Sequence, residues 1–434
     1  MDLLDRGKLT GRLARLSRFS VTMGLIQLMN MVCGFLIVNL LSVNDYALYT
    51  LVLMLTMSVK LLGSSGLVQI LLFDGGPNWR EPTQLGQSLR LVLRILKRLF
   101  PVVFVVAFPF VYYLLRETGF LLPVVLPYYL ILGGLALTMA LSSLFLEVAR
   151  LHGQLPLIMR TNFWAALSRL VVVGPLLYFV TEPWLALLAV VPGIFIELRN
   201  YGRFCRRKAP WRTGEAVDNS SEARAAMAWG RARKFILRSW PNDLFYIFSG
   251  LAKLTLLAVF GGAQTVASFG ALERFGVITT LVSLVVGNIF LPYYAKRDRQ
   301  GHLLATYFLL IAVATAVPLG FLAMTFVVPG QLLALLGRNY LGLEQALVLM
   351  AIGLCLLVIE SVSGKLMQVR GHILSPIWVV AGNLGSFTLF LLLFDVTTLS
   401  GVLWLAIAQS ATLGAINLLY AYRALRTESR AQPR

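Results

Sequence analysis

The chain has 434 residues, of which 58% are hydrophobic and 13% are charged. Soluble domains carry about 45–50% apolar and about 25% charged residues. This chain therefore has too few charged side chains to cover a water-exposed surface, and lipid must cover much of it. The formal net charge is +19, from 38 Lys and Arg against 19 Asp and Glu. In a membrane protein such an excess is typical of cytoplasmic loops, so no nucleic-acid partner is needed to explain it.

The N-terminus is basic and leads into an apolar stretch, as a secretory signal peptide does. No small-residue cleavage site follows this stretch, so we expect it to remain as the first membrane span. A span needs about 20 apolar residues, and the sequence predicts an all-α polytopic protein with about twelve spans. The predicted spans are 17–41, 46–73, 91–115, 119–148, 158–180, 183–204, 235–259, 265–294, 303–328, 344–369, 373–394 and 397–422.

The sequence repeats itself at a fixed offset. Arg150-Leu151-His152 recurs as Arg370-Gly371-His372 (370 − 150 = 220), and Tyr49 recurs as Phe269 at the same offset. Internal duplication is common in secondary transporters, which move two halves around a site between them. The duplication therefore predicts a transporter.

The duplication predicts two six-helix lobes. The N-terminal lobe is 1–204, the C-terminal lobe with its short cytoplasmic tail is 235–434, and the cytoplasmic linker 205–234 joins them. Lys and Arg gather in the loops on one side of the predicted spans, the side of both chain ends and of the linker. The positive-inside rule then predicts that both termini are cytoplasmic.

Eight ionisable side chains lie well inside the predicted spans, where they are costly and usually face a cavity or one another. They are Lys60, Arg169, Asp243, Lys253, Glu273, Arg274, Glu360 and Lys365. Further polar residues follow one face of a helix. Arg238, Asn242, Ser249 and Lys253 do so in the seventh span, and Gln27 and Asn30 in the first. Such stripes predict a shared, water-filled cavity.

The same charges can instead pair and tie helices together. Lys253 and Glu273 lie at similar predicted depths, so a structural and a functional role stay open for them. Lys60 and Arg169 have no obvious acidic neighbour in the sequence, which favours function. Arg238, like Arg18, lies near the cytoplasmic interface, where anchoring of the topology is the alternative to substrate capture.

Soluble-enzyme chemistry is not indicated. The cysteines Cys33, Cys205 and Cys355 fit no metal spacing, and the histidines are not arranged like a metal site. The chain carries no phosphate-cradling loop for a nucleotide. We therefore expect no enzyme, no metal and no cofactor, and transport driven by an ion gradient or by substrate flow.

Two segments resemble a known family. Residues Asn39–Tyr49 (NLLSVNDYALY) resemble a signature of polysaccharide flippases, and Leu335–Tyr340 (LLGRNY) resembles the stretch before their tenth span. On these residues, the span number and the duplication, the chain resembles O-antigen and exopolysaccharide repeat-unit flippases. That family belongs to the multidrug/oligosaccharidyl-lipid/polysaccharide exporter superfamily.

The resemblance implies a V-shaped, alternating-access transporter of the cell inner membrane. It implies transfer of polyprenyl-pyrophosphate-linked oligosaccharide to the outer leaflet, with membrane lipids, a polysaccharide polymerase and chain-length machinery as surroundings and partners. A pyrophosphate carries several negative charges, so a site that binds it needs the positive charges of Lys or Arg side chains. On this interpretation the substrate-binding residues are Lys60, Arg169, Lys253, Arg274, Arg18, Arg238, Gln27 and Asn30.

Three alternatives remain. The first is an ion-coupled multidrug antiporter of the same fold, in which Asp243, Glu273 and Glu360 bind organic cations or the coupling Na⁺ or H⁺. The second is a lipid II flippase, although such proteins usually have fourteen spans. The third is a non-transporting scaffold for polysaccharide assembly, which leaves the polar stripes unexplained.

Overall fold

The structure is a computed structural model. It describes residues 3–64, 66–68, 70–71, 79–117, 122–210, 244–245, 247–291, 294, 303–369, 372 and 374–430. Arg238, Asp243 and most of the predicted linker lie outside these residues.

The described chain is helical and contains no strand within those ranges. The α-helices are α1 Leu3–Leu40, α2 Val43–Ser64, α4 Pro82–Glu117, α5 Leu122–Leu151, α6 Leu155–Phe179, α7 Pro183–Leu188, α8 Val191–Lys208, α10 Gly262–Leu272, α11 Val277–Val285, α13 Leu303–Val327, α14 Pro329–Ala334, α15 Glu344–Val369, α16 Pro376–Leu393 and α17 Leu399–Arg430. Short non-α turns are η1 Leu257–Gly261, η2 Glu273–Gly276, η3 Val286–Phe290 and η4 Arg338–Tyr340. The predicted fold class is confirmed: this is an all-α, multi-pass membrane protein.

Each predicted span overlaps a helical segment of the described chain. Nine segments within the described ranges are long and apolar enough to cross a membrane, and the shorter Ile377–Leu393 adds to them. The seventh and eighth predicted spans fall in one helical run, Ile247–Val285. That run is interrupted between the two predictions by the π-helical η1 and by Gly262, whose φ is +69°. Glycine adopts this left-handed conformation without the strain of a side chain.

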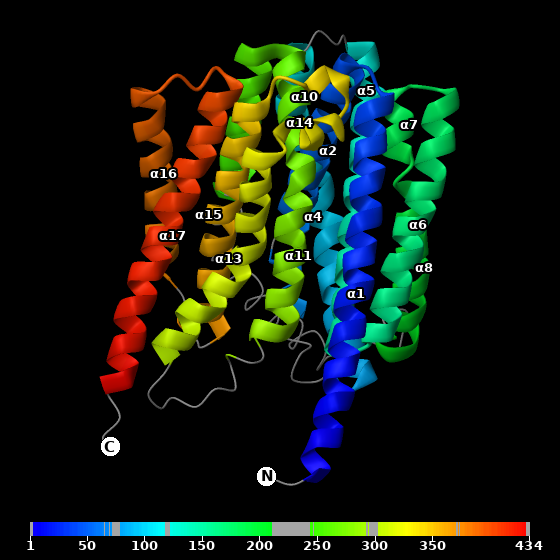
Figure 1. The fold of residues 1–434 in the computed structure, drawn as a ribbon. Helices are drawn as coiled ribbons and strands as arrows, with labels where there is room; N and C mark the ends of the chain where they lie inside the picture. Colours follow the sequence, from blue (N-terminus) through cyan, green and yellow to red (C-terminus); the bar gives the residue numbers. More distant parts are fainter. Residues whose placement is uncertain are drawn as a thin grey trace. The chain divides into compact units, whose positions relative to one another are not determined.

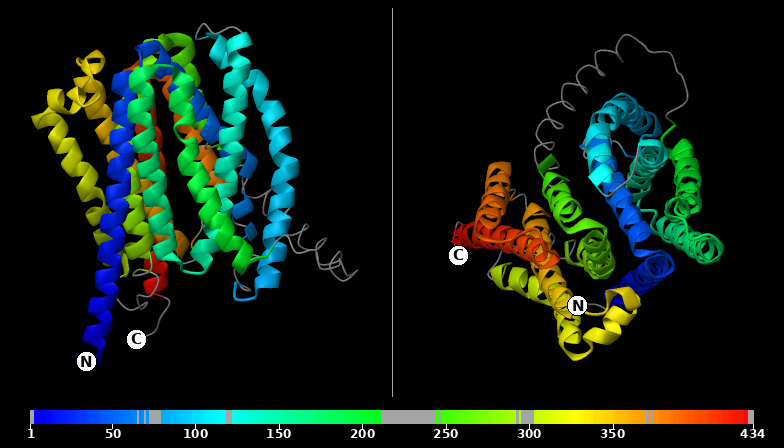
Figure 2. Two further views of the ribbon diagram at one scale, coloured as in Figure 1. Left: turned by 90° about the vertical axis from the view of Figure 1, so that its right-hand side faces the viewer. Right: turned by 90° about the horizontal axis from the view of Figure 1, so that it is seen from above.

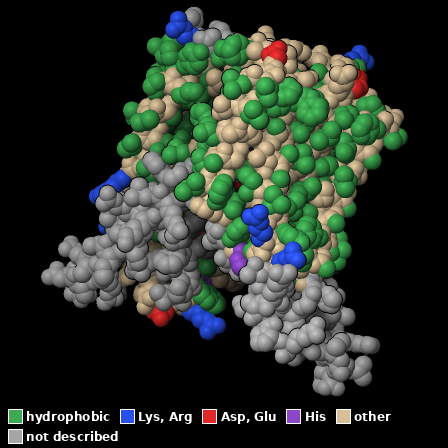
Figure 3. All heavy atoms as spheres, turned by 90° about the vertical axis from the view of Figure 1, so that its left-hand side faces the viewer, with side chains coloured by type: hydrophobic (Ala, Val, Ile, Leu, Met, Phe, Trp, Pro, Cys, Tyr) green, Lys and Arg blue, Asp and Glu red, His purple; other side chains and the backbone are tan. Residues whose placement is uncertain are grey.

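Large apolar side chains lie on the outer surface of the helices. On α4, for example, Val102, Val105 and Val106 are 59%, 69% and 71% exposed. The face in Figure 3 shows hydrophobic side chains over its broad middle and charged ones near its two ends. A soluble monomer rarely exposes so much contiguous apolar surface, so lipid is its natural surrounding.

The helices repeat at the offset found in the sequence. Adding 220 to Leu122–Leu151 gives 342–371, and α15 is Glu344–Val369. Adding 220 to Leu155–Phe179 gives 375–399, and α16 is Pro376–Leu393. The same shift carries α2 onto α10 and α11, α4 onto α13 and α14, and α7 with α8 onto α17.

The packing repeats as well. In the first half the helix pairs α2/α5, α5/α8, α6/α8 and α4/α5 are in contact. Their counterparts in the second half are also in contact, namely α11/α15, α15/α17, α16/α17 and α13/α15. Figures 1 and 2 show α13, α15, α16 and α17 side by side. Equivalent helices thus pack on equivalent neighbours, as duplication of one helical unit requires.

The chain divides into two compact units. Unit 1 is Met1–Asn39 with Phe260–Arg434, and unit 2 is Leu40–Val259. The two boundaries between the units, after Asn39 and after Val259, are separated by the repeat offset, since 39 + 220 = 259. The first helix of each repeat therefore packs with the remainder of the other repeat. The predicted lobes 1–204 and 235–434 follow the sequence repeat instead, and as lobes they stay a prediction.

A capping box begins α2 directly after the first boundary. The Ser42 hydroxyl donates to Asp45 Oδ2 at 2.6 Å and accepts from the Asp45 backbone N–H at 3.2 Å. These bonds satisfy polar groups at the helix start. Tyr46 and Tyr49 follow on the buried face, with ring centroids 6.0 Å apart. The Asn39–Tyr49 segment that carries the family resemblance is thus a helix end, a cap and a buried aromatic pair.

The two resembling segments meet in unit 1. The Asn39 side-chain amide donates to the Phe35 carbonyl at 2.8 Å and to the Leu335 carbonyl at 3.0 Å. Gly337 has φ +106°, and a Cβ built on it would lie 2.6 Å from Asn39 Oδ1. A glycine is therefore required at 337 by both its backbone and the closeness of Asn39.

We expect Gly337→Ala to destabilise the protein by about 1–3 kcal/mol, because it adds backbone strain and pushes the Asn39 side chain off Leu335. Asn39→Ala removes the same contact, so the double variant should cost less than the sum of the single variants. Midpoints of thermal unfolding in detergent measure this coupling.

Gly330→Ala is the matched control, since a Cβ at Gly330 meets nothing within 4 Å. Strictly additive effects of Gly337→Ala and Asn39→Ala would show that the contact does not hold α1 to this segment.

Candidate functional site

A polar cluster connects three helices of unit 2. The carboxylate of Glu197 on α8 accepts a 2.6 Å hydrogen bond from the Ser142 hydroxyl on α5. Glu197 also interacts electrostatically with the Lys60 ammonium on α2. Ser142 is 4% exposed, while Lys60 and Glu197 are half-buried. The Ser142 hydroxyl and the Glu197 carboxylate are thus bonded among apolar helices, and the charges of Glu197 and Lys60 act on each other from different helices.

Glu197 is the acidic partner that the sequence did not reveal for Lys60. The two residues are 137 positions apart (197 − 60), so no local spacing links them. The packing of α8 on α5, and of α5 on α2, brings them together.

A second set of polar contacts joins α8 to α6. The Tyr201 hydroxyl donates to Asn162 Oδ1 at 2.7 Å, and the Asn200 amide donates to the Thr161 hydroxyl at 3.3 Å. Tyr201 and Thr161 are fully buried. Together with Glu197, these α8 residues follow i, i+3 and i+4 steps, which place them on one helix face. That spacing is the signal by which the sequence could have revealed them.

Close approach of α6 and α8 depends on a glycine. A Cβ built on Gly193 would lie 2.9 Å from the Ala165 carbonyl oxygen, which is backbone and cannot move aside cheaply. The small side chain thus lets α8 bring its polar face against α6, as small residues do in membrane helix packing.

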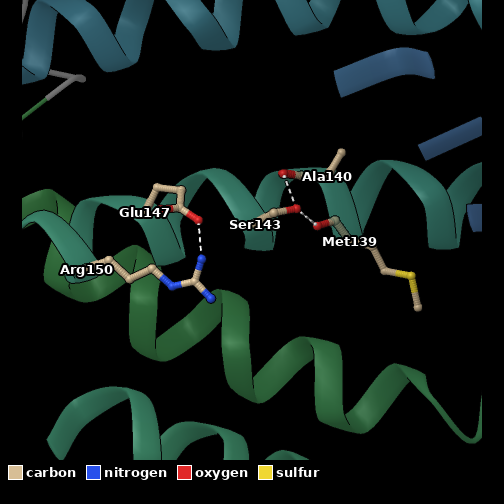
Figure 4. Close-up of polar contacts among 5 residues, drawn as sticks. All are labelled: Met139, Ala140, Ser143, Glu147 and Arg150. Carbon is tan, nitrogen blue, oxygen red and sulfur yellow. Dashed lines mark hydrogen bonds and ion pairs between the residues drawn. The ribbon is translucent and has the colours of Figure 1, made fainter. Parts of the chain in front are cut away.

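Several polar side chains of α2 and α5 are satisfied within their own helix. The hydroxyls of Thr56 and Ser64 donate to the carbonyls of Val52 and Lys60, at 2.6 and 2.7 Å. Thr56, Lys60 and Ser64 follow one another at steps of four residues on α2, and Lys60 is the charged one. On α5 the Ser143 hydroxyl bonds the Met139 and Ala140 carbonyls, as Figure 4 shows.

Glu147 forms a local ion pair on the same helix. Its carboxylate lies 2.5 Å from Arg150 Nη1, three residues further along α5 (Figure 4). The side chain of Arg150 is 56% exposed and that of Glu147 is 12% exposed. The negative charge of Glu147 is therefore compensated by Arg150 on the same helix.

Arg169 and Lys253 are the other predicted substrate-binding cations that the structure describes in unit 2. Arg169 lies in the middle of α6 and is half-buried, seven residues after Asn162. Lys253 is half-buried in the helical stretch 247–256. Its proposed partner Glu273 belongs to unit 1, so their pairing stays a prediction.

In unit 1 the structure brings Arg274 against α1. A Cβ built on Gly34 would lie 3.0 Å from Arg274 Cδ, so the arginine stem passes directly over that glycine. Asn30 and Gln27 lie four and seven residues before Gly34, on the same face of α1, and both are half-buried. Three predicted binding residues are thereby placed along one helix face.

The remaining predicted residues are distributed along the chain. Glu273 is exposed, and Glu360 and Lys365 are half-buried on α15, where the Asn417 amide of α17 donates to the Glu360 carbonyl at 3.2 Å. Arg18 lies on α1. Arg238 and Asp243 are outside the described residues.

The cluster around Glu197 is testable by stability. Lys60→Met leaves the half-buried Glu197 carboxylate without a nearby cation. We expect it to lower the free energy of unfolding by about 1–2 kcal/mol, a value between those of exposed and buried ion pairs. Glu197→Gln keeps an acceptor for Ser142 but removes the charge. The double variant should therefore unfold at a higher temperature than Lys60→Met alone.

Lys208→Gln, at the exposed end of α8, controls for a general loss of positive charge. If the double variant is no more stable than Lys60→Met alone, Lys60 and Glu197 are not coupled and the cluster is not a unit.

The comparison with known proteins gives the fold. No protein-family model matches the sequence, and no curated protein matches it. The structure is similar to the inward-facing conformation of a multidrug resistance MATE family transporter of the MOP superfamily, with TM-score 0.69, 15% identity and coverage of 94% of this chain and 96% of that chain.

Two further solved structures agree. The lipid II flippase MurJ, in an inward closed conformation, gives TM-score 0.68 at 12% identity, over 95% of this chain and 90% of that chain. An outward-facing MATE family transporter gives TM-score 0.59 at 16% identity, over 95% of each chain. The chain therefore has the fold of these membrane transporters over nearly its whole length.

Proposed function

We propose that this protein is a membrane transporter that flips polyprenyl-pyrophosphate-linked oligosaccharide from the cytoplasmic to the outer leaflet of the cell inner membrane, for cell-surface polysaccharide synthesis. The fold, shared with MATE transporters and with MurJ, supports transport rather than catalysis. The lipid-linked cargo and any polymerase or chain-length partners rest on the sequence resemblance and on the charges described below.

The observation that carries the proposal is a group of cations inside the described part of unit 2. Lys60, Arg169 and Lys253 are all half-buried within its helical spans. Desolvated cations are costly unless an anion joins them, and a pyrophosphate supplies several negative charges to such groups.

The remainder of the substrate also suits these surroundings. Asn162 and Asn200, both half-buried on α6 and α8, provide amide groups, and sugars form hydrogen bonds with such groups. A polyprenyl tail is as apolar as the lipid around the exposed valines of α4. The head group can therefore travel along the protein while the tail stays in lipid.

A lipid II substrate is the second candidate, because a lipid II flippase has this fold. Organic cations are the third, because MATE multidrug transporters have it too. The half-buried cations Lys60, Arg169 and Lys253 disfavour organic cations as the substrate, since like charges repel in a medium of low dielectric constant.

Reconstitution tests the proposal. Purified protein in liposomes should translocate a polyprenyl-pyrophosphate-linked oligosaccharide, with lipid II and a cationic dye as parallel probes. Lys60→Gln and Arg169→Gln should each lower the translocation rate about tenfold or more, the worth of one charge-assisted hydrogen bond. Arg160→Gln, at an exposed position on the same helix as Arg169, should leave the rate unchanged.

The outcomes separate the candidates. Transport of lipid II alone would replace the proposed cargo by the second candidate, and extrusion of the dye alone would replace it by the third. Translocation of the oligosaccharide at the wild-type rate by both Lys60→Gln and Arg169→Gln would show that these cations do not bind the cargo, and would remove the basis of the proposal.

A further inference from the structure

A cavity of about 520 Å³ lies in unit 2, between α4, α5 and α8. It is separate from the polar cluster, since none of Lys60, Ser142 and Glu197 lines it. Its volume is within the range of about 300–1,000 Å³ that is common for small-ligand sites. The predicted substrate-binding residues are also absent from its lining, so it is a second feature of this unit.

One wall of the cavity is strongly basic. Arg199, Arg203 and Arg206 on α8 line it, at steps of four and three residues that place them on one helix face. All three are exposed, and in the described chain no carboxylate forms an ion pair with them. Three guanidinium groups on one face are suited to a phosphate, which they can bind in a bidentate manner.

The opposite wall is apolar. Leu93 of α4 and Leu141 and Phe145 of α5 line it, with Leu198 of α8 beside them. An inorganic anion would gain nothing from these side chains. A ligand that fills the whole cavity must therefore carry a phosphate at one end and hydrocarbon at the other.

Two of the arginines lie closer to the helix ends than the leucines do. Arg206 and Arg203 lie two and five residues from the end of α8, whereas Leu141 lies ten residues from the end of α5. The basic loops predict that both helix ends are on the cytoplasmic side. In that orientation these two arginines are nearest the water, Arg199 and Phe145 lie between, and Leu141 is nearest the membrane interior.

Gly202 keeps the cavity open between the arginines. It lines the cavity, and a Cβ built on it would meet only the ring of Phe145, at 3.8 Å. This is an ordinary van der Waals distance, so the Cβ of a larger side chain at position 202 fits without a clash, and the remainder of that side chain can extend into the cavity. The position therefore allows the cavity to be filled without changing any charge.

We propose that this cavity binds an anionic glycerophospholipid of the cytoplasmic leaflet, with its phosphate on Arg199, Arg203 and Arg206 and the start of an acyl chain against Leu141 and Phe145. Basic pockets between membrane helices on the cytoplasmic side are a recognised arrangement for anionic head groups. A bound lipid would stabilise the α4, α5 and α8 packing without taking part in transport.

Native mass spectrometry of the full chain in a neutral detergent tests the site, with phosphatidylglycerol as the probe and phosphatidylcholine as the neutral reference. A neutral detergent micelle has no charged surface, so the measured binding does not include long-range electrostatic attraction between the protein and an anionic membrane. Arg203→Gln/Arg206→Gln should raise the apparent Kd for phosphatidylglycerol about 25-fold, because each lost arginine is expected to weaken binding about fivefold. Gly202→Leu should weaken binding about as strongly at unchanged charge.

The matched control is Arg207→Gln/Lys208→Gln, which removes two charges from the same helix end but from outside the cavity lining. It should change the Kd less than about threefold. An equal loss in this control, unchanged binding in Gly202→Leu, or equal affinity for phosphatidylcholine would each overturn the proposal.

A competition experiment distinguishes this lipid from the transported cargo. Phosphatidylglycerol should be retained in the presence of equimolar polyprenyl pyrophosphate. If equimolar polyprenyl pyrophosphate displaces it, the cavity is a loading site for cargo and the phospholipid proposal is wrong. The flippase proposal is tested separately by translocation, so either proposal can fail alone.

Discussion

The cost of leaving polar groups unsatisfied in lipid governs this structure. Backbone amides in hydrocarbon must bond within the chain, which makes every span a helix. The same requirement acts on side chains. Thr56, Ser64 and Ser143 satisfy it by bonding carbonyls of their own helices. They are therefore polar in sequence but contribute little to a polar wall.

The side chains that cannot be satisfied within one helix are those that join helices. Glu197 binds Ser142 from α5 and interacts with Lys60 from α2. Tyr201 and Asn200, on the same face of α8, bind α6. Helix α8 is thus the element on which unit 2 converges, and the predicted cation Arg169 lies on its neighbour α6. A chemistry that needs several polar groups close together is most readily built around this helix.

Much of the fold was predictable because hydropathy and repetition are local or periodic signals. Every predicted span overlaps a helix of the described chain, and the offset of Arg150 and Arg370 is the offset of the helices. The ends were less accurate. Helix α4 begins at Pro82 rather than near 91, because its basic first turns, with Arg90, remain helical outside the apolar run. The sixth span is divided into α7 and α8 just before Pro192.

The site was less predictable because its contacts join distant residues. Sequence spacing identified Lys60 but not Glu197, and it gave no reason for Asn39 to meet Leu335, 296 positions away. It placed Gln27, Asn30 and Arg274 in separate spans, yet Arg274 lies over Gly34 on the face of α1 that carries the other two. Periodicity predicts a helix face, whereas only packing decides which faces meet.

Duplication explains why the first helix of each repeat is special. A duplicated unit could keep all of its helices, yet the packing boundary lies after Asn39 and again 220 residues later, after Val259. Each boundary is followed by a break between helices: the hydrogen bonds of Ser42 that begin α2, and the positive φ of Gly262, at 42 + 220. These breaks allow a first helix to leave its own repeat and pack with the other.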